Sequence, residues 1–204
     1  MRSLSRCRLQ GGVIVAGVVL LSSAPAEAHL NSTGMGPIYD GLMHFLRSPE
    51  DLVPALALAL LAGLRGAAYG RRVSFTLPAA WLMGSLIGLT AGATTGSAVL
   101  SSLWFLVLGG LVIADAKLSL SAMTALAALF GLVHGYLNGA GMGQSRFAVV
   151  AILGLTSGVF VFIVLAAAIV VPLRAHWARI AVRVAGSWVA ASGLLLLGWA
   201  FRGS

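Results

Sequence analysis

The sequence predicts an all-α integral membrane protein with about six transmembrane helices that follow a cleaved signal peptide. Two observations support this fold class. Hydrophobic residues make up 59% of the 204-residue chain and charged residues only 9%, whereas soluble domains carry roughly 25% charged residues. The apolar residues also fall in long runs separated by short basic segments, which is the pattern of helices that cross a bilayer.

The net charge of +8 does not indicate a nucleic-acid-binding protein. The thirteen Lys and Arg residues stand in ones and twos between apolar runs, and they form no basic face or patch interleaved with aromatic residues. Basic residues between spans are instead signals of membrane topology. We therefore expect the lipid bilayer, and no nucleic acid, as a partner.

Residues 1–28 have the pattern of a secretory signal peptide. Three arginines precede an apolar stretch at 12–21, which is short for a membrane span, and Ala26-Glu27-Ala28 forms a cleavage site. An uncleaved first anchor is the alternative. Cleavage would remove the only cysteine, Cys7, and would leave His29 as the first residue, with a free amine and a ring nitrogen as two metal donors.

Residues 29–48 are mixed and amphipathic, and they predict a periplasmic segment that forms a short interfacial helix or a re-entrant loop. Ser48-Pro49-Glu50-Asp51 then predicts the start of the first span. Serine can cap a helix, proline suits the first helical position, and the two acids complement the positive end of the helix dipole.

A transmembrane domain is predicted for residues 49–204. Its apolar segments are each near the length that a hydrocarbon core of roughly 30 Å requires. They cover 49–69, 74–94, 98–115, 119–139, 146–172 and 180–201. Glycines recur every fourth residue in two of them, which predicts close helix packing in lipid: Gly84, Gly88, Gly92 and Gly96 in the second, and Gly131, Gly135 and Gly139 in the fourth.

The distribution of cations predicts the orientation. If His29 is periplasmic, the first, third and fifth connections face the cytoplasm, and they carry more cations than the outer segments. These cytoplasmic cations are Arg65, Arg71, Arg72, Lys117, Arg174, Arg179 and Arg183. The protein is therefore expected in the bacterial inner membrane with both mature termini in the periplasm.

One polar pair lies deep in a predicted span. Ionisable residues within membranes are costly and often functional, and His134 lies inside the fourth span with Asn138 one turn later on the same face. An imidazole nitrogen and an amide oxygen so placed can hold a cation or its hydration water. The alternative is a buried histidine that bonds to a neighbouring helix.

A second polar group is predicted near the outer membrane face. It comprises His29, Asp40, His44, Glu50 and Asp51. Carboxylates and imidazoles suit nickel, cobalt or zinc, so this group predicts a capture site for a divalent cation. Helix capping is the alternative role for Glu50 and Asp51.

Two stretches of the sequence resemble motifs of the HupE/UreJ family, which are small bacterial membrane proteins with about six spans linked to nickel or cobalt uptake. The first motif looks like His-Pro-x-x-Gly-x-Asp-His. In residues 44–51, His44 matches, Glu50 is an acid at the acidic position, and Asp51 stands where the second His is expected.

The second motif looks like His-Gly-Tyr-x-His-Gly-x-Glu. Asn138 stands for its second His and Gly141 for its Glu, while the matching residues are His134, Gly135, Tyr136 and Gly139. Beyond these motifs, the length of the chain, its signal peptide and its number of spans are also similar to those of the family, so the resemblance covers nearly the whole mature chain. The absent imidazoles and carboxylate indicate a divergent branch.

The resemblance implies a secondary permease for a divalent transition metal, Ni²⁺ or Co²⁺, with Zn²⁺ as a further candidate and no permanently bound cofactor. The chain has no phosphate-binding loop, so an energised partner or the membrane potential would drive transport. An accessory protein that delivers metal to a periplasmic metalloenzyme is the alternative, and His29 would then matter more than His134. We do not expect an enzyme, because Ser157 lacks the Gly-x-Ser pattern of a nucleophile paired with His134.

Overall fold

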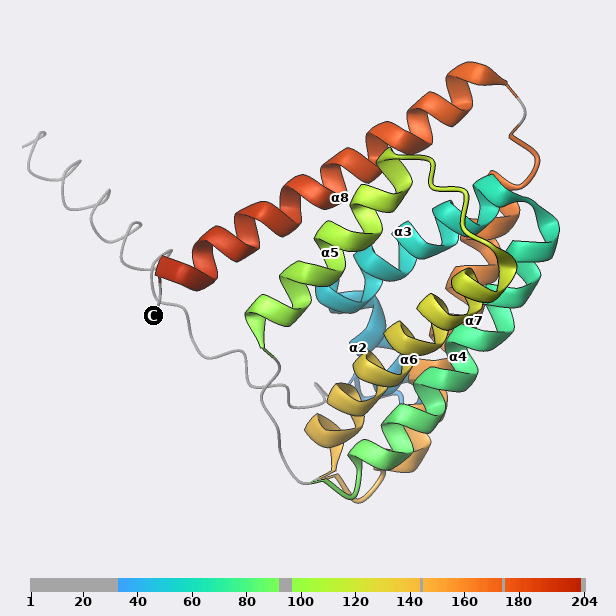
Figure 1. Cartoon of the computed structure of the whole chain (residues 1–204). Helices are drawn as coiled ribbons and strands as arrows, with labels where there is room; N and C mark the ends of the chain where they lie inside the picture. The colour runs from blue at the N-terminus through green and yellow to red at the C-terminus, as the bar shows by residue number, and fades with distance from the viewer. Residues whose placement is uncertain (1–32, 92–96, 144, 174, 203–204) are drawn as a thin grey trace, which may run out of the picture.

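The computed structural model describes residues 33–91, 97–143, 145–173 and 175–202. This part of the chain is entirely helical, in agreement with the predicted all-α class (Figure 1). Its helices are α2 (Pro37–Arg47), α3 (Pro49–Arg65), α4 (Ala67–Gly88), α5 (Ala98–Ile113), α6 (Leu120–Met142), α7 (Ala148–Val170) and α8 (His176–Arg202). The predicted signal peptide and His29 lie outside the described residues.

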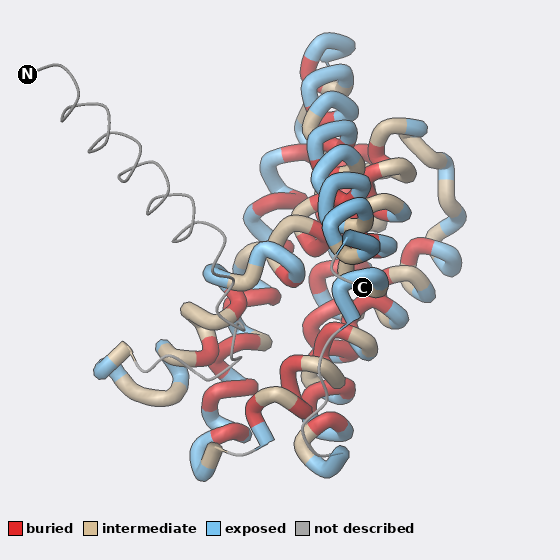
Figure 2. The backbone as a smooth tube through the Cα atoms, turned by 90° about the vertical axis from the view of Figure 1, so that its left-hand side faces the viewer, coloured by how far each residue is buried: buried red, intermediate tan, exposed pale blue. Residues whose placement is uncertain are grey.

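Helices α3 to α8 each overlap one of the six predicted apolar segments. Of these, α6, α7 and α8 are long and apolar enough to cross a membrane, and α5 is a shorter apolar helix. Large apolar side chains such as Ile169 and Trp188 are about 70% exposed, and Figure 2 shows exposed residues along most of α8. This is the surface of a membrane protein, while the number of six spans stays a prediction.

The basic residues predicted for two connecting loops lie within helices. Gly66 has a φ of 108° and separates α3 from α4 by a single residue, which glycine allows because it has no Cβ. Helix α4 therefore begins at Ala67 rather than near residue 74, and the exposed Arg71 and Arg72 belong to it. Likewise α8 begins at His176 and includes Arg179. These cations mark helix ends rather than loops.

Helices α4 and α6 pack with their backbones in contact, as the glycine spacing predicts. A Cβ at Gly135 would lie 2.1 Å from the carbonyl oxygen of Trp81, and a Cβ at Gly139 would lie 2.0 Å from that of Ser85. Only glycine permits such an approach. Gly92 and Gly96, the remaining members of the predicted stripe on the second span, lie outside the described residues.

Helices α2 and α3 are separated by Ser48 alone, whose backbone is extended. Helix α2 packs on α7, where a Cβ at Gly154 would lie 2.0 Å from the Ile38 carbonyl oxygen. The prediction that the Ser48 side chain caps α3 is wrong, because its hydroxyl donates to the carbonyl oxygen of His44 at 2.8 Å. The last carbonyls of α2 have no partner within their own helix, so the hydroxyl satisfies one of them.

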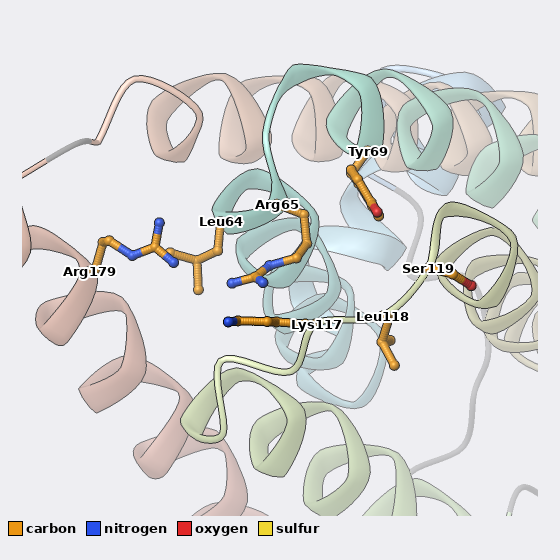
Figure 3. Close-up of a pocket in the computed structure, with 7 residues that line it drawn as sticks. All are labelled: Leu64, Arg65, Tyr69, Lys117, Leu118, Ser119 and Arg179. Atoms are coloured by element: carbon orange, nitrogen blue, oxygen red, sulfur yellow. The ribbon is translucent and has the colours of Figure 1, made fainter.

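The opposite end of α3 approaches the start of α8. Arg65 at the end of α3 and Arg179 in α8 both pair with Asp115, which follows α5. Figure 3 shows these two arginines and Lys117, from the connection between α5 and α6, around a common space. Three separate parts of the chain are thus tied together by charge at this end of the bundle.

Candidate functional site

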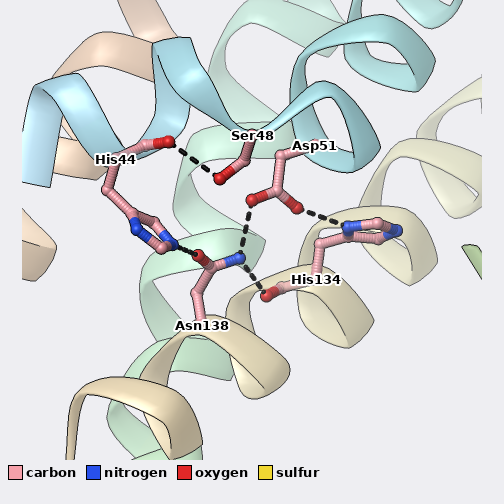
Figure 4. A network of polar contacts seen from close by, with 5 residues as sticks. All are labelled: His44, Ser48, Asp51, His134 and Asn138. Atoms are coloured by element: carbon pink, nitrogen blue, oxygen red, sulfur yellow. Dashed lines mark hydrogen bonds and ion pairs between the residues drawn. The ribbon is translucent and has the colours of Figure 1, made fainter. Parts of the chain in front are cut away.

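Four polar side chains lie close together near the junction of α2 and α3 (Figure 4). His44 comes from α2, Asp51 from the first turn of α3, and His134 and Asn138 from α6. The break at Ser48 matters because it ends α2 and allows the first turn of α3 to reach α6. Residues 83 to 94 positions apart in the sequence are thereby joined by direct hydrogen bonds.

Asp51 is the centre of this network. Its Oδ1 lies 2.7 Å from Nδ1 of His134, and its Oδ2 accepts a hydrogen bond of 3.0 Å from Nδ2 of Asn138. Both Asp51 and His134 are only 3% exposed. A buried carboxylate requires such partners, so the role of Asp51 extends beyond complementing the dipole of α3.

Asn138 relays the network from Asp51 to His44. Its amide nitrogen also donates to the carbonyl oxygen of His134 at 2.9 Å, and its Oδ1 lies 2.9 Å from Nε2 of His44. The amide nitrogen thus faces two acceptors, so the amide oxygen must accept from the imidazole. His44 accordingly carries its proton on Nε2.

The same reasoning assigns the proton of His134. An ionised carboxylate can only accept, so Nδ1 of His134 carries the proton and donates it to Asp51. In the neutral ring, Nε2 then holds a lone pair. This atom is buried and has no hydrogen-bond partner within the described residues. In metal sites, a carboxylate that is hydrogen-bonded to one imidazole nitrogen orients the other nitrogen toward the metal ion.

Aromatic rings surround the imidazole of His134. The ring centroids of Phe130, Trp81 and Trp104 lie 4.3, 5.7 and 6.1 Å from it. The indole nitrogens of both tryptophans are buried without a partner within the described residues. An unpartnered buried polar group costs about 1–3 kcal/mol, so the rings around His134 carry three nitrogen atoms whose hydrogen bonding is unsatisfied within the described residues.

The predicted outer group does not assemble as one site. His44 and Asp51 join His134 and Asn138, which merges part of it with the deep pair. Glu50 makes no hydrogen bond to the network and is exposed, although it lies near enough to Asp51, His134 and His44 for their charges to act on it. His29 lies outside the described residues. Asp40 accepts a hydrogen bond from the backbone nitrogen of Thr33, and this bond lowers the pKa of Asp40 below its usual range.

Sequence reasoning missed the two tryptophans. Indole rings favour the membrane interfaces, whereas Trp81 and Trp104 stand near the middle of α4 and α5. Their position near the middle of predicted spans was the signal that could have marked them as candidate site residues. Ser157, considered as a nucleophile, is exposed and donates its hydroxyl to the Leu153 carbonyl in its own helix, so it does not pair with His134.

The ligands needed for a permanently held metal do not come together in the described part of the chain. No three His, Cys, Asp or Glu residues there lie close enough to hold an ion. The network offers instead one unpartnered imidazole nitrogen beside a carboxylate and an amide.

A comparison with protein families identifies the chain. Residues 17–196 match the family model described as HupE / UreJ protein. No curated protein and no solved structure is significantly similar to the chain. The match extends over most of the chain and includes every residue of the His44–Asp51–His134–Asn138 network. The protein therefore belongs to the HupE/UreJ family, which suggests a role for this membrane protein in the handling of nickel or cobalt.

Proposed function

We propose that the protein is a secondary permease for a divalent transition-metal cation, Ni²⁺ or Co²⁺ in the first place and Zn²⁺ as a further candidate. The observation that carries the proposal is the Nε2 atom of His134, which is buried without a partner among the described residues, in a ring bonded to the Asp51 carboxylate and in a family linked to these metals. Neutral imidazole is a common ligand of all three ions.

Asp51 has two tasks in this mechanism. Its hydrogen bond holds the proton on Nδ1 of His134, which keeps the lone pair on Nε2 available. Its negative charge also offsets the cost of bringing a cation into a region of low dielectric constant. An imidazole alone would do neither, because its proton could occupy either nitrogen and its neutral ring carries no charge.

His44 and Asn138 extend the path toward α2. The two residues share a hydrogen bond, so a cation that reaches His44 Nδ1 would be one network step from the ligands in the centre. In the predicted orientation, this end of the path faces the periplasm. Inward movement would be driven by the membrane potential, which supplies about 2.3 kcal/mol per charge for each 100 mV.

A small ligand set favours transport over storage. A permease must release its cargo, so its sites must bind weakly enough for the ion to leave. One imidazole beside one carboxylate meets this condition, whereas three or four fixed ligands would trap a transition metal. An accessory protein that delivers metal to a metalloenzyme would bind the ion without carrying it across.

Purified full-length protein in sealed vesicles tests the proposal. With a metal-sensitive dye inside and an imposed potassium diffusion potential, the wild type should admit Ni²⁺ or Co²⁺. His134→Ala should reduce this flux by about tenfold or more. His176→Ala removes an imidazole at the start of α8, outside the network, and should leave the flux unchanged.

Two results would contradict the proposal. Equal flux in wild type and His134→Ala, at equal amounts of inserted protein, would exclude His134 from the path. Metal binding by the wild type without any flux would assign the protein to the accessory role.

A further inference from the structure

A second charged cluster lies at the far end of α3 and α6 from the His134 network. Asp115 Oδ2 accepts from Arg179 at 2.9 Å, and its Oδ1 pairs with Arg65. The distance from Asp51 to Arg65 along α3 is about 20 Å at the rise of an α-helix. This cluster is therefore separate from the proposed metal path.

Asp115 holds the two guanidinium groups in place. Partial burial acts to raise the pKa of Asp115, but the hydrogen bond from Arg179 and the charges of Arg65 and Arg179 outweigh it and lower the pKa below its usual value. The carboxylate is thus ionised at neutral pH and forms both ion pairs. Each guanidinium has five N–H donors, so most of the donors of Arg65 and Arg179 remain for another acceptor.

A cavity of about 480 Å³ opens beside this cluster. The side chains of Arg65, Lys117 and Arg179 line it together with the hydroxyl-bearing Tyr69 and Ser119. Figure 3 shows the ends of Arg65 and Lys117 close together and Arg179 approaching the same space from α8. Arg65 Nε is buried and has no hydrogen-bond partner within the described residues. Three cations and no carboxylate line the cavity, and the one carboxylate that pairs with two of them, Asp115, leaves an excess of positive charge there.

We propose that this cavity binds the phosphate group of an anionic ligand. Guanidinium groups match phosphate oxygens in pairs, and a lysine adds a point charge. A volume of this size accommodates a phosphate with the small group attached to it. The proposal does not depend on metal transport, because it uses none of the residues of the His134 network.

Two sources can supply such a phosphate: the headgroup of an anionic lipid and a soluble phosphate compound. The lipid is favoured by position. The cavity lies at helix ends on the side that the cation distribution assigns to the cytoplasm, and basic pockets between membrane helices there bind lipid headgroups. Leu64 and Leu118 also line the cavity, so apolar contacts are available for the part of the lipid that adjoins the phosphate.

Native mass spectrometry of the detergent-purified full-length protein tests this site. The protein is titrated separately with dioleoyl phosphatidylglycerol, with zwitterionic dioleoyl phosphatidylcholine, and with inorganic phosphate. Lys117→Gln is the main variant, because the ion pairs of Asp115 do not involve Lys117 and should survive. It should weaken phosphatidylglycerol binding at least about tenfold, the effect of one charged hydrogen bond. Lys117→Arg keeps the cation and should retain binding.

Arg72→Gln is the matched control, because it removes one exposed cation from α4 without altering the cavity lining. It should bind phosphatidylglycerol as the wild type does. Binding of inorganic phosphate alone, again lost in Lys117→Gln, would support the site with a soluble source. Equal lipid binding in wild type and Lys117→Gln, an equal loss in Arg72→Gln, or binding of neither phosphate probe would overturn the proposal.

Discussion

Asp51→Asn changes one oxygen of the buried network into an amide nitrogen and keeps the shape of the side chain. In the wild type, both carboxylate oxygens accept hydrogen bonds, from His134 and from Asn138. The variant has one oxygen, which can still accept from Asn138. Its new amide nitrogen would face Nδ1 of His134 as a donor, so His134 should move its proton to Nε2. The lone pair that the proposed mechanism requires would then be lost.

The expected effects on flux and on stability differ in size. Loss of the group that orients a metal-ligating histidine typically costs 10–100-fold in metal affinity or activity, so flux into vesicles should fall by about that factor. The free energy of unfolding should fall by only about 1–3 kcal/mol, because the hydrogen bond from Asn138 is kept and the one with His134 is reversed rather than lost. Asp51→Ala leaves Nδ1 of His134 without its partner and takes away one of the two acceptors of the Asn138 amide nitrogen, and it should cost about 3–5 kcal/mol.

Three measurements separate these effects: metal flux per inserted protein, thermal unfolding in detergent, and the ¹⁵N chemical shifts of the His134 ring, which report the protonated nitrogen. Asp40→Asn is the control, because it removes a carboxylate from α2 whose partner is Thr33 rather than the network. Wild-type flux in a normally inserted Asp51→Asn protein, or a ring still protonated on Nδ1, would refute the reasoning.

Three further predictions concern packing, pH and topology. Gly135→Ala should lower the free energy of unfolding by about 1–3 kcal/mol, because its Cβ would lie 2.1 Å from the Trp81 carbonyl oxygen. Gly110→Ala is the control, because its Cβ would meet no atom within 4 Å and should not lower the free energy of unfolding. Thermal unfolding in detergent compares the two variants. The pKa of Asp115 is lowered below its usual value of 3.8. Its ion pairs therefore contribute their full stability at pH values above 3.8, and this contribution is lost as the pH falls through the lowered pKa. Acidification should therefore destabilise the wild type more than Asp115→Asn, and parallel unfolding curves would contradict this. A fluorescent reporter inserted after Lys117 should fold, as it does only in the cytoplasm; a dark fusion would invert the orientation.

Much of the helical framework could be predicted because its signals are local. Long apolar runs indicated the segments that became α3 to α8, and glycines at four-residue spacing indicated that two of these helices pack closely against a neighbour, without indicating that α4 and α6 pack against each other. The boundaries were less predictable. A single glycine, Gly66, makes the turn between α3 and α4, and hydropathy cannot distinguish a one-residue turn from a basic loop that includes Arg71 and Arg72.

The pairing of His134 with Asn138 follows from the sequence alone, because residues four apart share a helical face. The position of Asp51 does not. A carboxylate in the first turn of a helix is predicted only to complement the dipole, and the packing of α2 and α3 into the bundle is what brings this carboxylate to α6. Local spacing determines which residues share one helix face. Contacts between residues 83 positions apart depend on how closely the helices approach, and the tertiary structure alone decides that.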